Sequence, residues 1–361
     1  MTEEHNSPPS RATGRGRTGG PRVKIIDVAA AAGVHPSTVS RVLRATPDGR
    51  VSHDVAARIR EAAETLGYRP DAIAASLRTR STRTIGVIVH DITDPVYPPI
   101  LRAVEDRLLE AGYMTVVGNT GYDPEAEAGM YERMVSRMVD GVILGTTRLG
   151  DPVVARATAA GVPLVSVLRR TATDACSAVV NDCASGMRML VDAIVARGHR
   201  DIAAIAAPQD LSTALERLEG LRAGLAAHGL DLPPDRLVFV ARMDMAEGRR
   251  ATEALLSRGG TPPETIVAVN DLVAMGAVLA CRARGLSCPR DISITGYNDI
   301  PLIDMMDPPL TTVAMDLARI GAGAADLLLK QLAAPGGAPA LVRVPPALRI
   351  RASLADAAGR A

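Results

Sequence analysis

Short runs of β-branched residues alternate with helical segments along most of this chain, from Ile85 onward. The runs include IGVIV, TVVGN, GVILG, PLVSV, SAVVND, IAAIAA, LVFVA, TIVAVN and ISITGYN. Apolar residues at helical spacing predict helices over 98–111, 124–138, 152–160, 215–228, 246–257 and 272–284, and another that ends at Ala196. Alternation on this scale is typical of parallel sheets with helices on both faces. The chain therefore predicts an α/β core.

This core is too long for one doubly wound sheet, because it extends over about 270 residues. It divides naturally near Asp182 into two similar halves. We expect one subdomain over about 85–182 plus 312–336 and the other over about 183–311 plus 337–352. Ligands in such folds bind beyond the carboxyl ends of the strands, so the loops there should converge on a cleft between the halves.

An all-α head is expected before the core, over 23–68. Apolar residues recur at helical spacing in three short segments, of which the first ends at Gly33 and the third begins after Ser52 and ends at Gly67. The middle segment lies in GVHPSTVSRVL, residues 33–43, whose end reads like the second helix of a DNA-reading helix-turn-helix. Such a turn also occurs as plain structure, so the pattern alone leaves both readings open.

The second helix is expected to begin near Pro36, because proline at the first helical position loses no hydrogen bond. His35 then stands at the N-cap, where it caps more weakly than Ser or Thr but could contact a phosphate or a base. The N-terminal residues of a reading helix lie at the base edges, and Arg41 is the strongest candidate for pairing with guanine. The candidate DNA-binding residues of the head are His35, Pro36, Ser37, Thr38, Ser40 and Arg41.

Charge is divided unevenly along the chain. Residues 1–83 hold 14 Lys and Arg against 8 Asp and Glu, whereas the rest holds 27 against 32. The basic residues 1–83 precede an acidic remainder, which indicates that only the N-terminal part binds a polyanion. Residues 1–22 are rich in Pro, Gly, Ser and Arg and lack apolar periodicity, which predicts a disordered basic arm that either adds phosphate contacts or only solvates the chain.

Motifs for catalysis and metal binding are missing from the sequence. It contains no GxxxxGK[ST], no GxGxxG after the first strand of the core, no GxSxG and no HExxH. The four cysteines form two pairs, each separated by six residues, a spacing that does not suit zinc. No apolar run approaches the roughly 20 residues that span a bilayer, and the first 22 residues are polar. We therefore expect no enzyme, no metal, no cofactor, no membrane partner and a cytoplasmic protein.

The order and spacing of these motifs resemble those of the lactose/purine-repressor (LacI) family of transcription regulators. The resemblance covers about residues 23–350. It rests on KIIDVAAAAGVHPSTVSRVL, VSHDVAARIREAAETLGYRPDAIAASLRT, VDGVILG, VVNDCASG, RGHRDIAAI, VNDLVAMGAV, GLSCPRDISITGYND and DPPLTTV. It implies a helix-turn-helix head, a hinge helix that orders on DNA, and a core like that of periplasmic sugar-binding proteins.

The expected hinge helix or linker occupies 69–84. Leu77 matches the leucine that wedges into the minor groove in this family, and the adjacent Arg78 is expected to contact phosphate. Ordinary packing within a linker is the alternative for Leu77. The chain departs from the family pattern at His35, Asp71 and Ala75, and the last two reduce the positive charge of the hinge and should weaken its minor-groove contacts.

The resemblance also implies effector contacts in the loops that face the cleft. Matching positions are Asp94, Val96, Tyr97, Arg217, Asp271 and Asn298. Simpler roles compete, because Arg217 could be a surface charge, Tyr97 a wall residue and Asp271 only a helix N-cap. Arginines that follow strands of the first half, Arg148, Arg169 and Arg170, together with Arg217 hint at an acidic effector, although solvated rim charges are an equal alternative.

These observations predict a homodimeric transcription regulator that binds near-palindromic double-stranded DNA. We expect it to act as a repressor. A sugar-like or sugar-acid-like effector between the core subdomains would control it. The tail after Leu348 lacks a leucine heptad, so a dimer is expected rather than a tetramer. The alternative is a solute-binding protein with the same core and no role in gene regulation.

Overall fold

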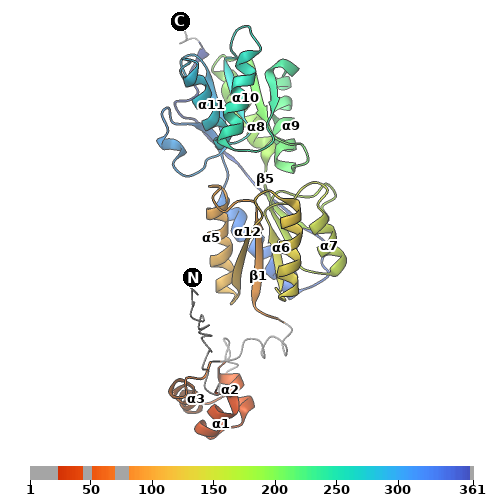
Figure 1. Cartoon of the computed structure of the whole chain (residues 1–361), viewed down its shortest axis with the longest axis vertical. Helices are drawn as coiled ribbons and strands as arrows, with labels where there is room; N and C mark the ends of the chain where they lie inside the picture. The colour runs from red at the N-terminus through yellow and green to blue at the C-terminus, as the bar shows by residue number, and fades with distance from the viewer. Residues whose placement is uncertain (1–22, 44–50, 70–80, 358–361) are drawn as a thin grey trace, which may run out of the picture. The chain divides into compact units, whose positions relative to one another are not determined.

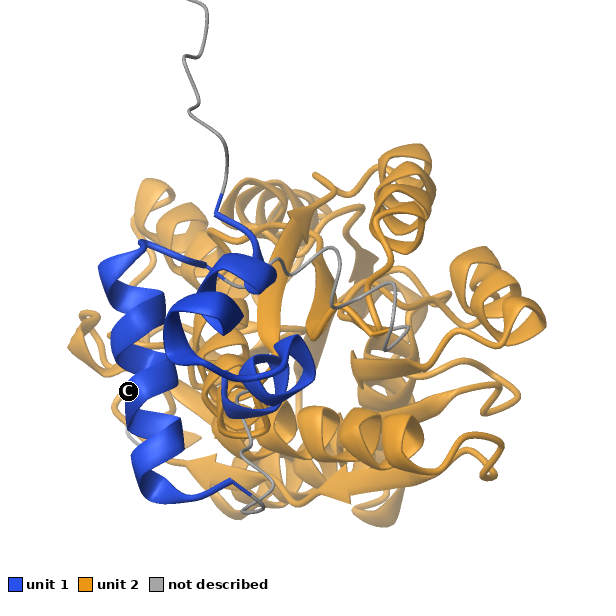
Figure 2. Ribbon diagram, turned by 90° about the horizontal axis from the view of Figure 1, so that it is seen from below, with its two compact units in different colours: residues 1–80 blue, residues 81–361 orange. Residues whose placement is uncertain are grey.

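The computed structural model describes residues 23–43, 51–69 and 81–357. Two compact units divide the chain between residues 80 and 81 (Figure 2). No helix in the described part of the chain is both long enough and apolar enough to cross a membrane.

The first unit contains the three predicted helices, α1 (Ile25–Ala32), α2 (Pro36–Val42) and α3 (His53–Thr65). One side chain from each helix, Val28, Val39 and Ile59, is fully buried in their shared core. Gly33 ends α1 in the left-handed conformation, with φ of 64°, that glycine adopts without strain. The all-α head predicted for 23–68 is therefore present.

The second unit contains two six-stranded sheets. The first has the order β11-β5-β4-β3-β1-β2, and its strands are β1 (Thr84–Val89), β2 (Met114–Asn119), β3 (Gly141–Leu144), β4 (Leu164–Leu168), β5 (Ser177–Asn181) and β11 (Leu341–Val344). The second has the order β12-β10-β9-β8-β6-β7, and its strands are β6 (Ile202–Ala206), β7 (Leu237–Phe239), β8 (Thr265–Ala268), β9 (Ser293–Asn298), β10 (Thr311–Ala314) and β12 (Ala347–Arg349). Neighbouring strands run parallel except for β10 and β12.

Helices cover both faces of each sheet (Figure 1). In the first subdomain they are α5 (Tyr97–Glu110), α6 (Pro124–Ser136), α7 (Pro152–Ala160) and α12 (Leu317–Ala333). In the second they are α8 (Cys183–Ala196), α9 (Ser212–Ala227), α10 (Met245–Ser257) and α11 (Asp271–Ala283), with short 3₁₀ turns at Pro234–Arg236 and Ile303–Met305. Two helices pack together on each face, α5 with α12, α6 with α7, α8 with α9 and α10 with α11. The doubly wound α/β core is confirmed.

Two of the predicted subdomain boundaries are wrong by several residues. Strand β10, which was divided between the subdomains near residue 312, lies wholly in the second sheet, where Val313 pairs with Tyr297 of β9. Strand β11, predicted in the second subdomain, lies in the first sheet, where Val342 pairs with Val179 of β5. A short β-branched run can extend either sheet, and the open sheet edge that it reaches decides its partner.

Candidate functional site

Helix α2 begins as the sequence predicts, with His35 at the N-cap and Pro36 as its first residue. The backbone N–H of Ser37 donates to Nδ1 of His35 at 3.2 Å. Because Nδ1 accepts this bond it carries no proton, and the Ser37 hydroxyl also donates to it at 2.7 Å. His35 therefore caps the helix with one ring nitrogen, and Nε2 is the ring atom left for a contact with DNA.

The remaining candidate residues of α2 lie away from the core of the head. Val39 and Val42 are buried against α1 and α3, whereas Ser37 is exposed and Thr38, Ser40 and Arg41 are half-buried. One face of α2 therefore holds the bundle together, and the polar side chains lie outside that face. This division is the one that a reading helix requires.

A cavity with a volume of about 410 Å³, partly open to solvent, lies between the two subdomains of the core. Six of the predicted effector positions line it, namely Asp94, Val96, Tyr97, Arg169, Arg217 and Asn298. The structure adds Leu168, Thr213, Met243, Asn270 and Met315 to the lining.

Arg217 lies on α9, and its side chain is almost completely buried. Its Nη1 donates to the carbonyl oxygen of Val269 at 2.7 Å, and its Nη2 donates to Oδ1 of Asn298 at 3.0 Å. The guanidinium lies 3.8 Å from the centre of the Tyr297 ring, which favours a cation. These contacts exclude the alternative that Arg217 is a surface charge.

Arg169 directly follows β4, and it is also buried. Its Nη1 donates to Nε2 of His90 at 2.6 Å, and the His90 ring stacks on Tyr122 with 4.7 Å between the ring centres. Burial, followed by the charges of Arg169 and Arg148, lowers the pKa of His90 to about 3. His90 is therefore neutral. No sequence motif points to His90, although its place directly after β1 is a signal that could have identified it.

Asp94 and Tyr97 enter the cavity from the loop that precedes α5 and from its first turn. Oδ1 of Asp94 accepts from the N–H of Val96 at 3.0 Å, and burial raises the pKa of this carboxyl group above its ordinary value. The Tyr97 hydroxyl donates to the carbonyl oxygen of Gly145 at 3.0 Å. Tyr97 is thereby fixed in the cavity wall.

Asp271 and Arg148 do not line the cavity. Asp271 is fully buried, and its two oxygens accept from the Thr312 hydroxyl at 2.6 Å and from the N–H of Ile300 at 2.9 Å. The N-cap of α11 is Asn270, whose Oδ1 accepts from the N–H of Val273 at 2.9 Å, so Asp271 is not the cap of this helix. Arg148 forms an ion pair with Asp210.

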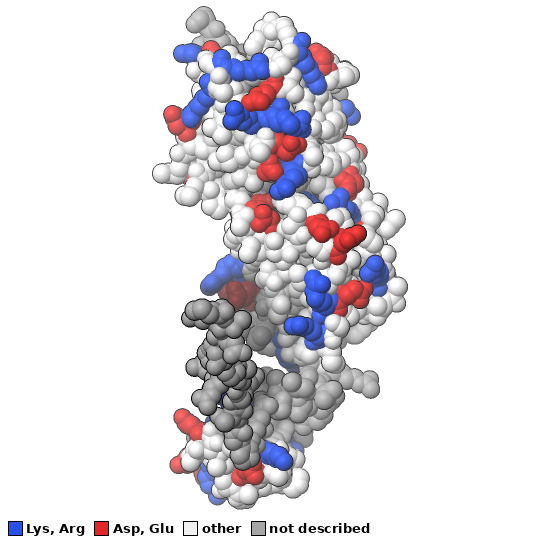
Figure 3. Space-filling model, in the orientation of Figure 1, with Lys and Arg blue, Asp and Glu red and all other residues white. Residues whose placement is uncertain are grey.

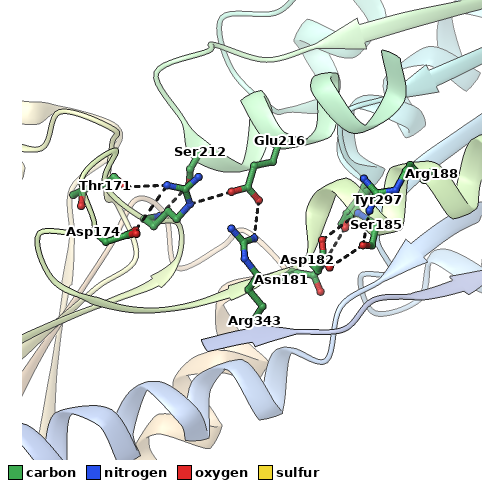
Figure 4. Close-up of polar contacts among 11 residues, drawn as sticks. Thr171, Asp174, Asn181, Asp182, Ser185, Arg188, Ser212, Glu216, Tyr297 and Arg343 are labelled. Carbon is green, nitrogen blue, oxygen red and sulfur yellow. Dashed lines mark hydrogen bonds and ion pairs between the residues drawn. The ribbon is translucent and has the colours of Figure 1, made fainter. Parts of the chain in front are cut away.

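An ionic bridge joins the subdomains beside the cavity. Nε of Arg170, which follows Arg169 after β4, donates to Oε1 of Glu216 on α9 at 3.0 Å, and Nη1 of Arg343 on β11 donates to Oε2 at 3.4 Å (Figure 4). The backbone N–H of Arg170 also donates to Oγ of Ser212 at 3.0 Å. Glu216 of the second subdomain therefore forms ion pairs with two arginines of the first, Arg170 and Arg343.

Similar proteins identify the class of this molecule. The sequence profile of the bacterial regulatory proteins, lacI family, matches residues 24–71, and that of the periplasmic binding protein-like domain matches residues 191–354. The ribose operon repressor of Escherichia coli K12 is 33% identical over 86% of this chain and 93% of its own length. The chain belongs to the lacI family of bacterial regulatory proteins.

Other relatives of this lacI-family chain agree in fold. The transcriptional repressor CytR of Escherichia coli K12 is 31% identical over 85% of this chain and 89% of its own. A lac repressor dimer bound to operator and an anti-inducer superimposes with a TM-score of 0.81, at 27% identity, over 93% of this chain and 100% of that chain. A CelR–cellobiose complex superimposes with a TM-score of 0.71, at 28% identity, over 92% and 100% of the two chains. These relatives are regulators, not enzymes.

The lacI-family profile includes all three helices of the head, so the family resemblance found in the sequence is confirmed and a binding protein without a DNA-binding domain is excluded. The hinge candidates Leu77 and Arg78 lie outside the described residues, as do Asp71 and Ala75. On the face shown in Figure 3, acidic and basic side chains of the described core are interspersed. That face offers no surface of one sign for a polyanion.

Proposed function

We propose that this lacI-family protein is a homodimeric transcriptional repressor that binds operator DNA and is controlled by a small polar effector of the sugar or sugar-acid class. The observation that carries the proposal is the cavity between the subdomains, which is lined by the buried Arg169 and Arg217 together with other polar side chains. The same chain has a DNA-binding head. A protein that binds chromosomal DNA works in the cytoplasm, and we place it there.

The DNA contacts are assigned to α2 and the hinge. Arg41 reads a base in the major groove, and His35, Pro36, Ser37, Thr38 and Ser40 lie at the entrance of the reading helix, where the choice of operator is made. Leu77 inserts into the central minor-groove step, and Arg78 contacts phosphate. The polar face of α2 described above supports the first assignment, and the family resemblance supports the second.

The effector acts by binding one arrangement of the core subdomains better than another. Arg169 belongs to the first subdomain and Arg217 to the second, so a ligand that contacts both is sensitive to their separation. Asn298 and Asp94 supply hydrogen-bonding groups for hydroxyls from the same two sides. Changes in this separation alter the hinge and hence the affinity for DNA.

Dimer formation is supported by the edge strand β2. It ends the first sheet, and its apolar side chains Met114, Val116 and Val117 are exposed together with Leu109 of the preceding helix. An uncovered apolar edge strand promotes association with another chain. A two-fold dimer places two heads on a near-palindromic site.

The decisive experiment selects binding sites for the full-length protein from random DNA and then measures affinity by gel shift with and without candidate effectors. We expect a near-palindromic site, protection of both half-sites in a footprint, and a change in affinity with an effector. Light scattering should give the mass of a dimer. Equal affinity for selected and random DNA would contradict operator recognition, and a monomer by light scattering would contradict the dimer.

A further inference from the structure

Four arginines near the cavity fall into two classes. Arg148 forms an ion pair with Asp210, and Arg170 forms ion pairs with Glu216 and Asp174. Arg169 and Arg217, which line the cavity, have no ion pair with any described residue, although they are only 6% and 5% exposed. The two arginines that enter the cavity are therefore the two whose charge is not neutralised by direct contact.

The hydrogen-bond partners of Arg169 and Arg217 are neutral. Arg169 donates to the unprotonated His90, and Arg217 donates to the carbonyl oxygen of Val269 and the amide oxygen of Asn298. Nε of Arg217 is buried and makes no hydrogen bond within the described part of the chain. A buried cation is costly unless an anion accompanies it. Among the described residues, neither guanidinium forms an ion pair.

Nearby carboxyl groups offset only part of this charge. Asp94 lines the cavity with one oxygen already accepting from Val96, and burial raises its pKa. Asp271 lies outside the lining, both of its oxygens are hydrogen-bonded, and burial raises its pKa to about 7. Two guanidinium groups and one lining carboxyl group leave an excess of one positive charge in the cavity.

We infer that the cavity selects a singly charged anion, a small polyhydroxy carboxylic acid, over the corresponding neutral sugar. The inference rests on the effector site of the proposed function. The carboxylate accepts from Arg169 and Arg217, one from each subdomain, while the lining side chains of Asn298, Thr213 and Asp94 bind the hydroxyls. A phosphate monoester carries nearly two charges, which exceeds the excess of one and brings a dianion close to Asp94.

Titration calorimetry with the full-length protein tests this choice. The ligands are matched pairs, D-glucose with D-gluconate, D-galactose with D-galactonate and D-ribose with D-ribonate, together with D-glucose 6-phosphate. At least one acid should bind about 10-fold or more tightly than its neutral partner, because a hydrogen bond to a charged group has that effect. The sugar phosphate should bind more weakly than the best acid.

Four variants locate the charge that is responsible. Arg169→Gln and Arg217→Gln should each weaken binding of the best acid by about 10-fold or more. Arg156→Gln, which removes an exposed guanidinium paired with Glu132 within the first subdomain, should change it by less than about 3-fold. Asp94→Asn should strengthen it. Circular dichroism confirms the fold, and Arg217→Lys replaces Arg217→Gln if that variant does not fold.

Each contrary result has a distinct meaning. Tighter binding of a neutral sugar than of its acid overturns the anion preference and leaves an effector-controlled repressor. Tighter binding of the sugar phosphate than of the best acid overturns the preference for a singly charged ligand. If no acid binds, the inference is wrong, and the gel-shift experiment then decides independently whether the protein is an operator-binding repressor.

Discussion

Arg170 of the first core subdomain and Glu216 of the second form an ion pair across the boundary between them, with 3.0 Å between Nε and Oε1. Arg343 approaches the other oxygen of the same carboxylate at 3.4 Å. Glu216 is almost completely buried, so solvent screens these pairs less than pairs on the surface. This bridge stabilises the arrangement of the subdomains in which the cavity is formed.

Glu216→Gln should destabilise the core by about 1–3 kcal/mol, because it removes the charge that two arginines share. It should also weaken effector binding, because fewer molecules hold the subdomains in the observed arrangement. Urea unfolding and calorimetry measure the two effects. Asp106→Asn, which breaks the exposed pair with Arg102, is the control and should cost less than about 0.5 kcal/mol. Equal losses for both variants would contradict a special role for the bridge.

Asp271→Asn should change how the stability of the core depends on pH. Burial raises the pKa of Asp271 from 3.8 to about 7, so the folded protein keeps a proton that the unfolded chain loses. The wild type therefore loses stability as the pH rises from about 4 to about 7, and the penalty is complete above that range. The Asp271→Asn variant does not lose stability in this way, because the amide side chain has no proton to release in this range.

The difference in unfolding free energy between Asp271→Asn and wild type should accordingly shift in favour of the variant across this range, with a slope of up to about 1.4 kcal/mol per pH unit. Urea unfolding at a series of pH values measures it, and subtraction cancels groups that titrate alike in both proteins. A difference that stays constant with pH would show that Asp271 does not titrate there.

His35→Ala should loosen the start of α2. The imidazole accepts from the N–H of Ser37, and loss of an N-cap costs about 1 kcal/mol. Hydrogen exchange at the Ser37 amide should become about 5-fold faster. His35→Ser restores a capping oxygen and should keep exchange near the wild-type rate. If the two variants exchange alike, the cap observed at His35 does not stabilise the helix.

Arg41→Ala should cost about 1–3 kcal/mol of affinity for the selected operator while leaving binding to random DNA nearly intact, because a bidentate contact to a base carries specificity. Gel shifts on both DNAs measure the two affinities. An equal loss on random DNA would assign Arg41 to phosphate. Arg58→Ala on α3 provides a matched control for loss of one positive charge from the head.

Gly248→Ala should separate α10 from α11. A Cβ atom at Gly248 would lie 2.3 Å from the carbonyl oxygen of Val273, and backbone cannot yield as a side chain does. We expect a loss of about 2 kcal/mol or more in a thermal unfolding experiment. Gly323→Ala on α12 is the matched control, because its nearest neighbour would lie at 3.5 Å and alanine favours a helix. Destabilisation by both would point to helix flexibility instead of close packing.

Local sequence patterns determined the positions and boundaries of most helices in this protein. The period of the apolar residues placed α7 at Pro152–Ala160 and most other core helices within three residues of their observed ends, because amphipathic periodicity is a property of a short segment. Gly33 marked the end of α1 and Pro36 the start of α2, through backbone preferences that each residue carries by itself. Family motifs then indicated which loops face the cavity.

Only the tertiary structure decided the pairings between distant residues. It assigned β10 and β11 to their sheets, placed Asn270 and not Asp271 at the start of α11, and added His90 beside Arg169. The four arginines look alike in the sequence, but Asp210 and Glu216 neutralise two of them. Whether a charge is compensated depends on distance and burial across the fold, which no local pattern contains.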